Sequence, residues 1–250
     1  MRYAVLSDIH GNLHALDAVM EMLASARVDR YLCLGDIVGY GAHPVECLAR
    51  IQAAQARVVA GNHDVACVGK LDLAWFHDAG RMALLWTRDQ LSIPNLDWLR
   101  RLPLTDVLEP FTLVHASLKQ PERFDYLLDV AHVIETLALC RTPICLAGHT
   151  HVPWLVSYDL SRRHVERVIT TSDALADVPV DDRADRRHFI NPGSVGQPRD
   201  GDPRASVALI DTEPRRVSIR RVAYDIDGAA QAIRQAGLPA FLADRLRLGR

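Results

Sequence analysis

The sequence predicts an α/β fold, and three observations point to this class. Short, unbroken apolar runs recur along the 250-residue chain, and such runs are typical of strands buried on both faces. Amphipathic helical patterns separate the first three runs, which predicts parallel strands joined by right-handed crossovers. Most runs end directly in Asp, Asn, His and Gly residues. Because open α/β sheets bind ligands at the carboxyl ends of their strands, we expect these polar clusters to meet at one edge.

The N-terminal part of the chain predicts an alternating β-α-β-α-β unit. A helix is expected over 13–23, with Asn12 as its N-cap, because apolar residues recur there at helical spacing. A second, shorter helix is expected over 44–51, where Pro44 suits the first turn. Strands are expected at 3–6, 31–34 and 58–60.

The rest of the chain predicts one further helical segment, a loop and a mixed tail. Residues 70–101 show a helical pattern without a matching strand, so 70–104 is expected as a helical cap inserted in a single domain over 1–250. Residues 170–187 are polar and rich in Asp, which predicts a loop. The tail is expected to be helical over 227–248. Further strands are expected at 111–114, 144–147, 189–190, 205–210 and 217–222.

Three aromatic residues in the cap segment have two interpretations. Trp75, Phe76 and Trp86 stand at helical spacing, which favours core packing. If the segment covers the sheet edge, one of these rings could instead stack on a nucleobase.

Composition excludes several classes of protein. Apolar residues make up 49% of the chain, and 29 basic against 31 acidic residues leave a formal net charge of −2. This balance argues against a disordered chain and against a protein that coats nucleic acid. The N-terminus lacks the apolar stretch of a signal peptide, and no run approaches the length of a membrane span. Five cysteines without a CxxC pair predict reduced, buried thiols in a cytoplasmic protein.

The polar clusters contain the side chains of a metal site. Asp8 and His10 are two residues apart, which in an extended segment puts both side chains on one face, and His149 and His151 repeat this spacing. Such oxygen and nitrogen ligands suit Mn, Fe, Co, Ni or Zn. Seven ligands exceed a tetrahedral site and predict two divalent metal ions that share a bridging carboxylate. The candidate ligands are Asp8, His10, Asp36, Asn62, His115, His149 and His151.

Two divalent metals in this set of ligands would favour phosphate chemistry. Two-metal sites clamp the attacking and leaving oxygens of an in-line phosphoryl displacement. Four positive charges against the two carboxylates of Asp8 and Asp36 leave a net positive site that attracts an anion. A water bridging the two ions would have its pKa lowered to roughly 7 and act as hydroxide. Each motif alone could be a cap or a turn, but independent turns would not assemble a full ligand set.

Five sequence blocks, in order, resemble the calcineurin-like metallophosphoesterase superfamily, in particular its small bacterial and archaeal phosphodiesterases. The resemblance continues through Asn191-Pro192-Gly193-Ser194. The blocks are Asp8-x-His10, Gly35-Asp36-x-x-Gly39, Gly61-Asn62-His63-Asp64, His115 and Gly148-His149-Thr150-His151.

The resemblance implies a fold, a ligand assignment and catalytic roles. The implied fold is a four-layer α/β/β/α sandwich of two mixed sheets. His63 would stabilise or protonate the leaving oxygen without binding metal, and Asp64 would orient His63 through a hydrogen bond. Asp36 would bridge the two metals. One metal would take Asp8, His10, Asp36 and His151, and the other Asp36, Asn62, His115 and His149.

The sequence also departs from two branches of that superfamily. Phosphoprotein phosphatases and symmetrical dinucleoside tetraphosphatases carry GDxVDRG and GNHE, whereas this chain reads GDIVGYG from Gly35 and GNHD from Gly61. The phosphate-binding Arg of those branches is therefore missing, which argues against phosphoprotein substrates. We expect a hydrolase of small-molecule phosphodiesters or phosphoanhydrides, such as nucleotides or dinucleoside polyphosphates. A non-catalytic scaffold of the same fold and a nuclease are the alternatives.

Substrate contacts are expected from the loops near the metal edge. The segment 191–204 has the Gly and Pro content of a structural loop, but it also carries Arg199 and Arg204. We expect one of them, in the first place Arg199, to contact a substrate phosphate. Tyr40 and His43 either line the cleft or belong to a plain loop. Packing or surface roles are expected for His14, His77, His132, His164 and His188, and for Cys67 a place in the core.

Overall fold

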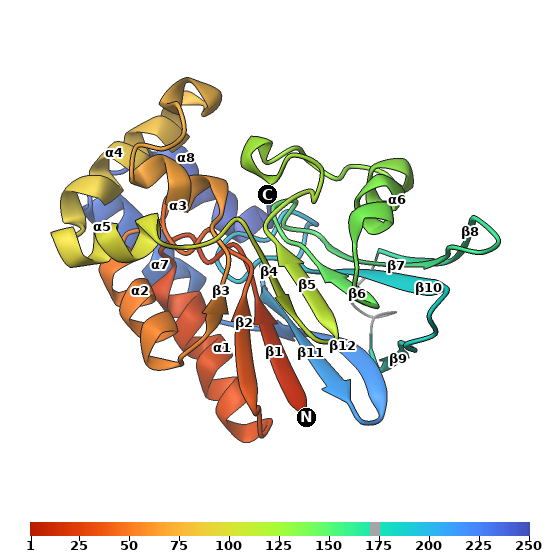
Figure 1. Ribbon diagram of the computed structural model, residues 1–250. Coiled ribbons are helices and arrows are strands. Elements are labelled where there is room, and N and C mark those ends of the chain that lie inside the picture. The colour runs from red at the N-terminus through yellow and green to blue at the C-terminus, as the bar shows by residue number, and fades with distance from the viewer. Residues whose placement is uncertain (171–175) are drawn as a thin grey trace.

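The computed structural model describes residues 1–170 and 176–250. Two six-stranded mixed sheets lie face to face, and helices cover their outer faces (Figure 1). The predicted α/β/β/α sandwich is therefore confirmed. Every helix in the described part of the chain is too short or too polar to cross a membrane.

The first sheet has the strand order β3-β2-β1-β11-β12-β9. Strands β1 to β3 are parallel, and β11 pairs with β1 in the antiparallel direction. The expected β-α-β-α-β unit is confirmed, with α1 and α2 as its crossovers. The strands are β1 (Arg2–Leu6), β2 (Arg30–Cys33), β3 (Arg57–Val58), β9 (Val178–Pro179), β11 (Ala205–Thr212) and β12 (Arg215–Val222).

The second sheet has the order β4-β5-β6-β10-β7-β8. Its three central strands β5, β6 and β10 are parallel, and these are the strands that apolar runs predicted. The edge strands β4 and β8 were not predicted because they alternate or expose most of their side chains. The buried strand β7 was also missed. The strands are β4 (Thr105–Leu108), β5 (Phe111–Val114), β6 (Ile144–Leu146), β7 (Pro153–Asp159), β8 (His164–Ile169) and β10 (Arg186–Pro192).

The apolar core lies in three layers that follow from the alternation of side chains along each strand. Tyr3 and Val5 of β1 face the second sheet, where the Tyr3 ring meets Phe111 edge-on with centroids 4.9 Å apart. Ala4 and Leu6 point the other way, into the cluster beneath α1 (Leu13–Ser25) and α2 (Pro44–Ala53). On the second sheet, α6 (Val130–Leu139) covers the outer face.

The helix starts follow the expected rules. The Asn12 side chain accepts a hydrogen bond from the Ala15 N–H at 3.1 Å and so caps α1. Pro44 stands in the first turn of α2. The tail forms α7 (Ile226–Gln235), α8 (Ala240–Asp244) and the 3₁₀ turn η4 (Arg245–Leu248) instead of one continuous helical stretch. The break follows from Gly237, at φ 71°, and Pro239.

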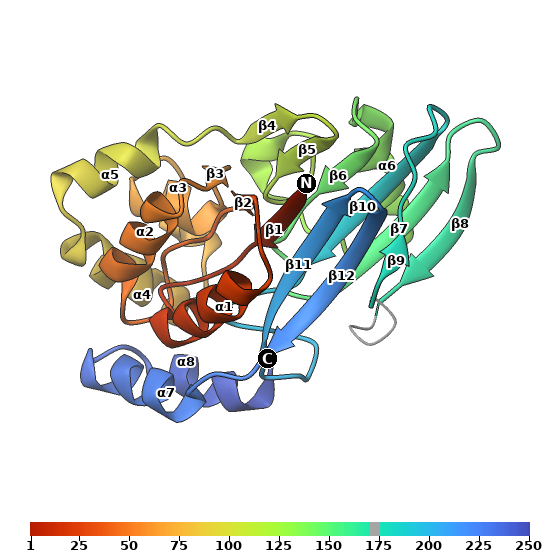
Figure 2. The ribbon, with the colours of Figure 1, turned by 90° about the horizontal axis from the view of Figure 1, so that it is seen from below.

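The segment expected as a cap forms α4 (Asp78–Gln90) and α5 (Ile93–Arg100), preceded by the 3₁₀ turn η1 (Leu73–Trp75). These helices lie at the end of the first sheet with α2 and α3 (Asn62–Cys67), as Figure 2 shows from below. Leu84 of α4 joins the core cluster of that sheet. Whether this segment acts as a cap over the substrate stays a prediction.

Two further expectations are resolved by the fold. The loop expected over 170–187 is interrupted by β9 and by the start of β10 at Arg186, while its residues 171–175 lie outside the described part. The strands form there because β12 and β7 offer unpaired edges to them. All five cysteines are buried free thiols, and Cys67 is in the core as expected.

Candidate metal centre and active site

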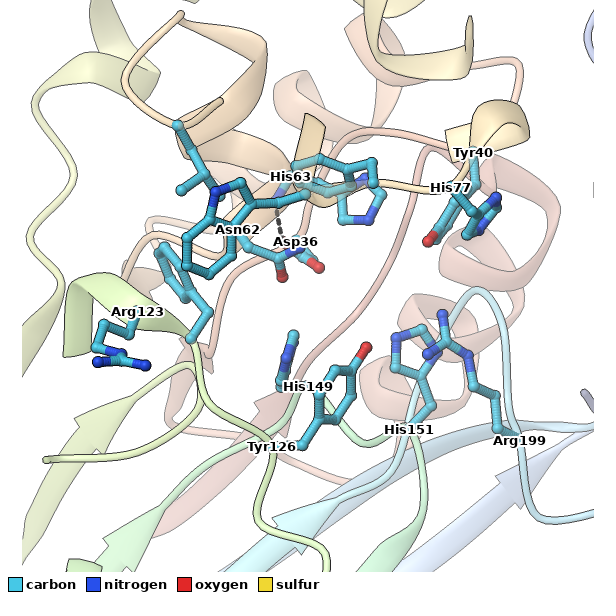
Figure 3. Close-up of a pocket in the computed structure, with 14 residues that line it drawn as sticks. Asp36, Tyr40, Asn62, His63, His77, Arg123, Tyr126, His149, His151 and Arg199 are labelled. Carbon is cyan, nitrogen blue, oxygen red and sulfur yellow. Dashed lines mark hydrogen bonds between the residues drawn. The ribbon is translucent and has the colours of Figure 1, made fainter. Parts of the chain in front are cut away.

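The loops that follow five parallel strands bring all seven candidate ligands together. Asp8 and His10 follow β1, Asp36 follows β2, and Asn62 opens α3 just after β3. His115 follows β5 of the other sheet, and His149 and His151 follow β6. The site therefore lies where the carboxyl ends of strands from both sheets meet. Figure 3 shows four of these ligands, Asp36, Asn62, His149 and His151, among the residues that line the pocket. The buried members are Asp8, His10, Asp36, His115, His149 and His151.

The first group of ligand atoms comes from Asp8, His10 and His151. Their metal-ligating atoms all lie within 4.8 Å of one another. His151 Nε2 is 3.3 Å from Asp8 Oδ1 and 3.2 Å from His10 Nε2. The Nδ1 atoms of the two histidines contact the carbonyl oxygens of Val38 and Gln197, at 3.3 and 2.6 Å. A carbonyl only accepts, so each Nδ1 carries the proton and each Nε2 presents a lone pair to the site.

The second group comes from Asp36, His115 and His149, again within 4.8 Å of one another. His115 Nε2 is 3.0 Å from His149 Nδ1 and 3.2 Å from Asn62 Oδ1. His115 Nδ1 donates to the carbonyl of Leu34 at 2.7 Å, which turns Nε2 inward. These two groups hold six of the seven candidate ligands, and Asn62 lies beside the second group.

Asp36 stands between the two groups. Its Oδ2 is 3.6 Å from His10 Nε2 and 3.4 Å from His115 Nε2, while its Oδ1 accepts the N–H of His63 at 2.8 Å. One carboxylate oxygen is therefore within reach of both groups, as a bridging ligand requires. A third group of possible ligands, His10, Asp36 and His63, also meets the 4.8 Å limit. Geometry alone would thus admit His63 as a ligand, contrary to its expected role.

The unpaired atoms of the site fit a pair of cations. Asp8 Oδ1 and His149 Nε2 are fully buried, and neither has a hydrogen-bond partner among the described residues. Nε2 lone pairs of His10 and His151 face each other at 3.2 Å with no proton between them. Buried acceptors that face one another are costly unless a donor or a cation lies between them. The set of donors, imidazoles with carboxylates and an amide, is the one expected for first-row divalent metals.

Burial sets the charge state of most of these histidines. It lowers the pKa of His10 well below its usual value, and it lowers the pKa of His149 to about 3. His115 differs: burial opposes its protonation, but the charges of Asp36 and Asp8 outweigh burial and raise its pKa to about 9. Imidazoles in the neutral form are the ones that ligate metals.

The backbone of the ligand loops is strained, and this corrects one expectation. Asp8 and His10 both have left-handed backbones, at φ 54° and 51°, so they do not share a face of an extended segment. His149 and His151 are left-handed too, at φ 66° and 61°, and they reach different metal groups. Asp36 completes the set at φ 52°. Strained residues persist where the surroundings hold them, and they cluster at functional sites.

Asp64 holds one of these strained loops, which corrects its expected role. Its carboxylate accepts the main-chain N–H groups of Asp36, Ile37, Val38 and Gly61, at 2.8 to 3.3 Å. In the part of the chain that the structure describes, His63 Nδ1 has no hydrogen-bond partner, so the expected Asp64–His63 bond is absent. Burial and the charge of Asp36 raise the pKa of Asp64 to about 7, whereas the N–H donors favour its ionised form.

Ring packing, and not a hydrogen bond, fixes His63. Its ring centroid is 4.3 Å from that of Tyr40 and 4.9 Å from that of Phe76. Gly39, at φ +88°, leaves room for the ring, because a Cβ at that position would collide with His63 Nδ1. Gly61 similarly admits the Asp36 carboxylate.

The Asn191–Ser194 segment ties the ligand loops of the two sheets together. Asn191 Nδ2 donates to the carbonyl of Gly148 at 2.7 Å, and Ser194 Oγ donates to the carbonyl of Asp8 at 2.7 Å. The structural interpretation of this loop is thus correct for its first residues.

An open pocket of about 140 Å³ lies over the candidate ligands. Tyr40 and Arg199, the two expected substrate-binding residues, both line it. Arg123 and Arg199 lie at opposite ends of the pocket in Figure 3, with Asp36 and His149 between them. Arg204, the weaker candidate, is ion-paired with Asp202 at 2.7 Å.

Comparisons with known proteins decide the family. The model of the calcineurin-like phosphoesterase superfamily domain matches residues 1–215. The chain belongs to this superfamily. It is 37% identical to an uncharacterized protein of Methanocaldococcus jannaschii over 99% of this chain and 98% of the relative. It is 25% identical to phosphodiesterase YfcE of Escherichia coli over 85% of this chain and 89% of that protein.

A solved structure supports both family and fold. The metallophosphoesterase of Sphaerobacter thermophilus superposes with a TM-score of 0.86 at 37% identity, covering 100% of both chains. Membership of this superfamily makes the protein a phosphoesterase, hence a hydrolase, as the resemblance predicted. The superfamily and the buried His and Asp clusters also support binding of divalent metal.

Several residues around the pocket depart from what the sequence predicted. Trp75 was expected in the core, but its side chain is 64% exposed and lines the pocket with Phe76. His77 was expected to have a packing or surface role, and it both lines the pocket and caps α4. The prediction assumed α-helical spacing, but this part of the chain forms the 3₁₀ turn η1, which buries none of its residues. Trp86 does pack against a buried cluster.

Three further pocket residues were missed. Arg123 ends the 3₁₀ turn η2 (Pro121–Arg123), and Phe124 and Tyr126 follow it. Together they form a second side of the pocket. The Tyr126 ring stacks on His149, with centroids 3.9 Å apart. This segment carries no sequence motif. The only feature that could have predicted a place in the pocket is the presence of two aromatic residues close to an arginine. The other histidines stay outside the pocket, with His188 buried between Ser157 and the Asp181 carbonyl.

Proposed function

We propose that this protein is a phosphoesterase with two divalent metals, which hydrolyses phosphodiester or phosphoanhydride bonds of small molecules. One observation carries the proposal: Asp36 Oδ2 lies close to a histidine of each of the two buried ligand groups. Asp8, His10 and His151 would hold one metal, and Asn62, His115 and His149 the other, with Asp36 between them. When bound, the metals would stabilise charge on the phosphoryl oxygens and lower the pKa of water.

The protein's own side chains would bind the substrate and assist departure of the leaving oxygen. His63 lies over Asp36 and faces the pocket, a place from which it would stabilise or protonate the leaving oxygen. Tyr40 and Phe76 would keep its ring in that orientation. Asp64 acts through the Asp36 loop and is therefore a positioning residue. Arg199 would bind a further anionic part of the substrate.

The substrate class follows from the mixed lining of the pocket. Trp75 and Phe76 supply rings from one side, and Phe124 and Tyr126 supply rings from another. Aromatic rings next to cationic side chains suit a molecule that has a planar base and phosphate groups. We therefore favour nucleotides or dinucleoside polyphosphates as substrates, in a cytoplasmic protein. The near-neutral charge of the chain supports a small substrate over nucleic acid.

A metal reconstitution experiment tests this function. The protein is stripped of metal, reloaded with Mn, Fe, Co, Ni or Zn, and assayed on phosphomonoesters, phosphodiesters and dinucleoside polyphosphates. We expect two metal equivalents per chain, with activity rising as the second is bound, and Mn among the active ions. Stable binding of two metals without turnover of any ester would favour the non-catalytic scaffold instead. Preferred cleavage of DNA or RNA would favour the nuclease.

A further inference from the structure

The four candidate histidine ligands differ in how their rings are held. Three of them donate from Nδ1 to a main-chain carbonyl oxygen, at 3.3, 2.7 and 2.6 Å for His10, His115 and His151. His149 has no such bond. Its Nδ1 is 3.0 Å from His115 Nε2, and its buried Nε2 has no hydrogen-bond partner within residues 1–170 and 176–250. A hydrogen bond to the second ring nitrogen normally fixes the orientation of a metal-ligating imidazole, so the His149 ring needs another support.

The Tyr126 ring supplies a contact that can orient His149. The two rings are stacked, with centroids 3.9 Å apart and an angle of 29° between their planes. This is the shortest separation between two rings in the described part of the chain. Figure 3 shows the two side chains next to each other in the lining of the pocket. Stacked rings attract each other beyond the effect of the area that they bury, and the contact restricts rotation of the imidazole.

The segment around Tyr126 is anchored so that the ring stays at this place. Phe124 and Leu127, on either side of Tyr126, are both buried. The Phe124 ring also meets the His115 ring edge-on, with centroids 5.9 Å apart. One segment therefore contacts both histidines of the second ligand group. His115 has its carbonyl bond in addition, so His149 should depend more on this segment than His115 does.

Other aromatic residues of the rim do not have such a contact. Trp75 lines the same pocket, but among the residues that the structure describes its ring is not in contact with any histidine ring. Tyr126 is half exposed like an ordinary rim residue, and one face of its ring is nevertheless occupied by a candidate ligand. Its place thus indicates a role beyond contact with a substrate.

We propose that Tyr126 is a positioning residue for His149 and raises the affinity of the second metal, the one that Asn62, His115 and His149 would hold. The inference rests on the proposed function for the presence of that metal. The first metal should not depend on Tyr126, because main-chain carbonyls already orient His10 and His151. Tyr126 would therefore connect the exposed rim of the pocket with the metal centre.

Calorimetric titration of the metal-stripped protein with Mn²⁺ tests this role without an assay of activity. We expect two binding steps in the wild type, and the step that Asn62→Ala weakens identifies the second metal. Tyr126→Ala should weaken that step by about 10-fold, the lower end of the effect of removing a partner of a metal ligand, and leave the other step unchanged. Tyr126→Phe keeps the ring and should keep the affinity of the wild type.

Leu128→Ala is the matched control, because Leu128 is an exposed apolar residue of the same segment that does not line the pocket over the ligands. It should leave both steps unchanged, and the thermal midpoint of each variant shows whether the fold is kept. Two unchanged steps in Tyr126→Ala, or an equal loss in both, would overturn the inference alone. An equal loss in Tyr126→Phe would assign the effect to the hydroxyl and overturn the role of ring stacking. A wild type that binds one metal only would contradict the proposed function as well.

Discussion

The candidate metal ligands and the rim of the pocket are built in opposite ways. Most of the ligands are buried, and their loops are held by hydrogen bonds, such as those that main-chain N–H groups of the Asp36 loop donate to the Asp64 carboxylate. The rim consists of partly exposed rings and arginines, with Trp75 64% exposed and Tyr126 46% exposed. We infer that the buried part decides which bond is broken, and that the exposed rim decides which molecule is bound.

The rim also differs in where it comes from along the chain. Ligands stand directly after strands, whereas the rim draws on η1, η2 and the loop at Arg199. Changes in the buried part should therefore abolish chemistry for all substrates. Changes in the rim should shift affinity between substrates, and the following experiments test this division.

The largest effect is expected for Asp36→Ala. Because one oxygen of Asp36 is within reach of both ligand groups, its removal should lower the binding of both metals and abolish turnover. Metal analysis and activity assays measure the effect, with Asn62→Ala as the comparison that should chiefly affect one metal. Two retained metal equivalents with normal activity would contradict the dinuclear assignment.

His63→Ala should lower kcat by about 10²–10⁴-fold, the usual contribution of a general acid or base. The variant should keep its fold and both metals, because His63 is not expected to be a ligand. The loss should be greater for esters with poor leaving groups, which need a proton most. Loss of one metal would instead assign His63 to the ligand group with His10 and Asp36.

Arg199→Ala tests the rim. It should raise KM for dinucleoside polyphosphates by about 10-fold or more, the worth of one charge-assisted contact, and leave nitrophenyl diesters nearly unaffected. Arg247→Ala is the control, because this arginine does not line the pocket and pairs with Asp227 at 2.8 Å. Equal effects of Arg199→Ala on both substrates would show that Arg199 does not bind a further phosphate and that its loop has a structural role only.

The smallest effect is expected for Trp75→Ala. Stacking of a base on an aromatic ring contributes about 1 kcal/mol at the lower end of its range, which fits an exposed ring, so the KM of a nucleotide substrate should rise roughly 5-fold and kcat should change little. Met82→Ala, another exposed apolar residue of this segment that does not line the pocket, serves as control. An unchanged KM would show that Trp75 does not contact the bound substrate.

The site could be predicted well from the sequence where its residues follow strands directly. Asp8, Asp36 and His115 each stand within a few residues of a buried strand, so the place of the strand end fixed the place of the side chain. The argument from an extended segment failed for His10 and His151, because left-handed backbones turn them. Such turns depend on hydrogen bonds from distant loops, which local sequence does not reveal.

The sequence by itself determined the class of fold, the ligand set and the resemblance to a phosphoesterase. These follow from local patterns: apolar runs make strands, and the polar residues after them lie at the sheet edge. Only the tertiary structure decided the role of Asp64 and the exposure of Trp75. Each of these depends on contacts between segments far apart in the chain, and periodicity within a segment carries no information about its distant neighbours.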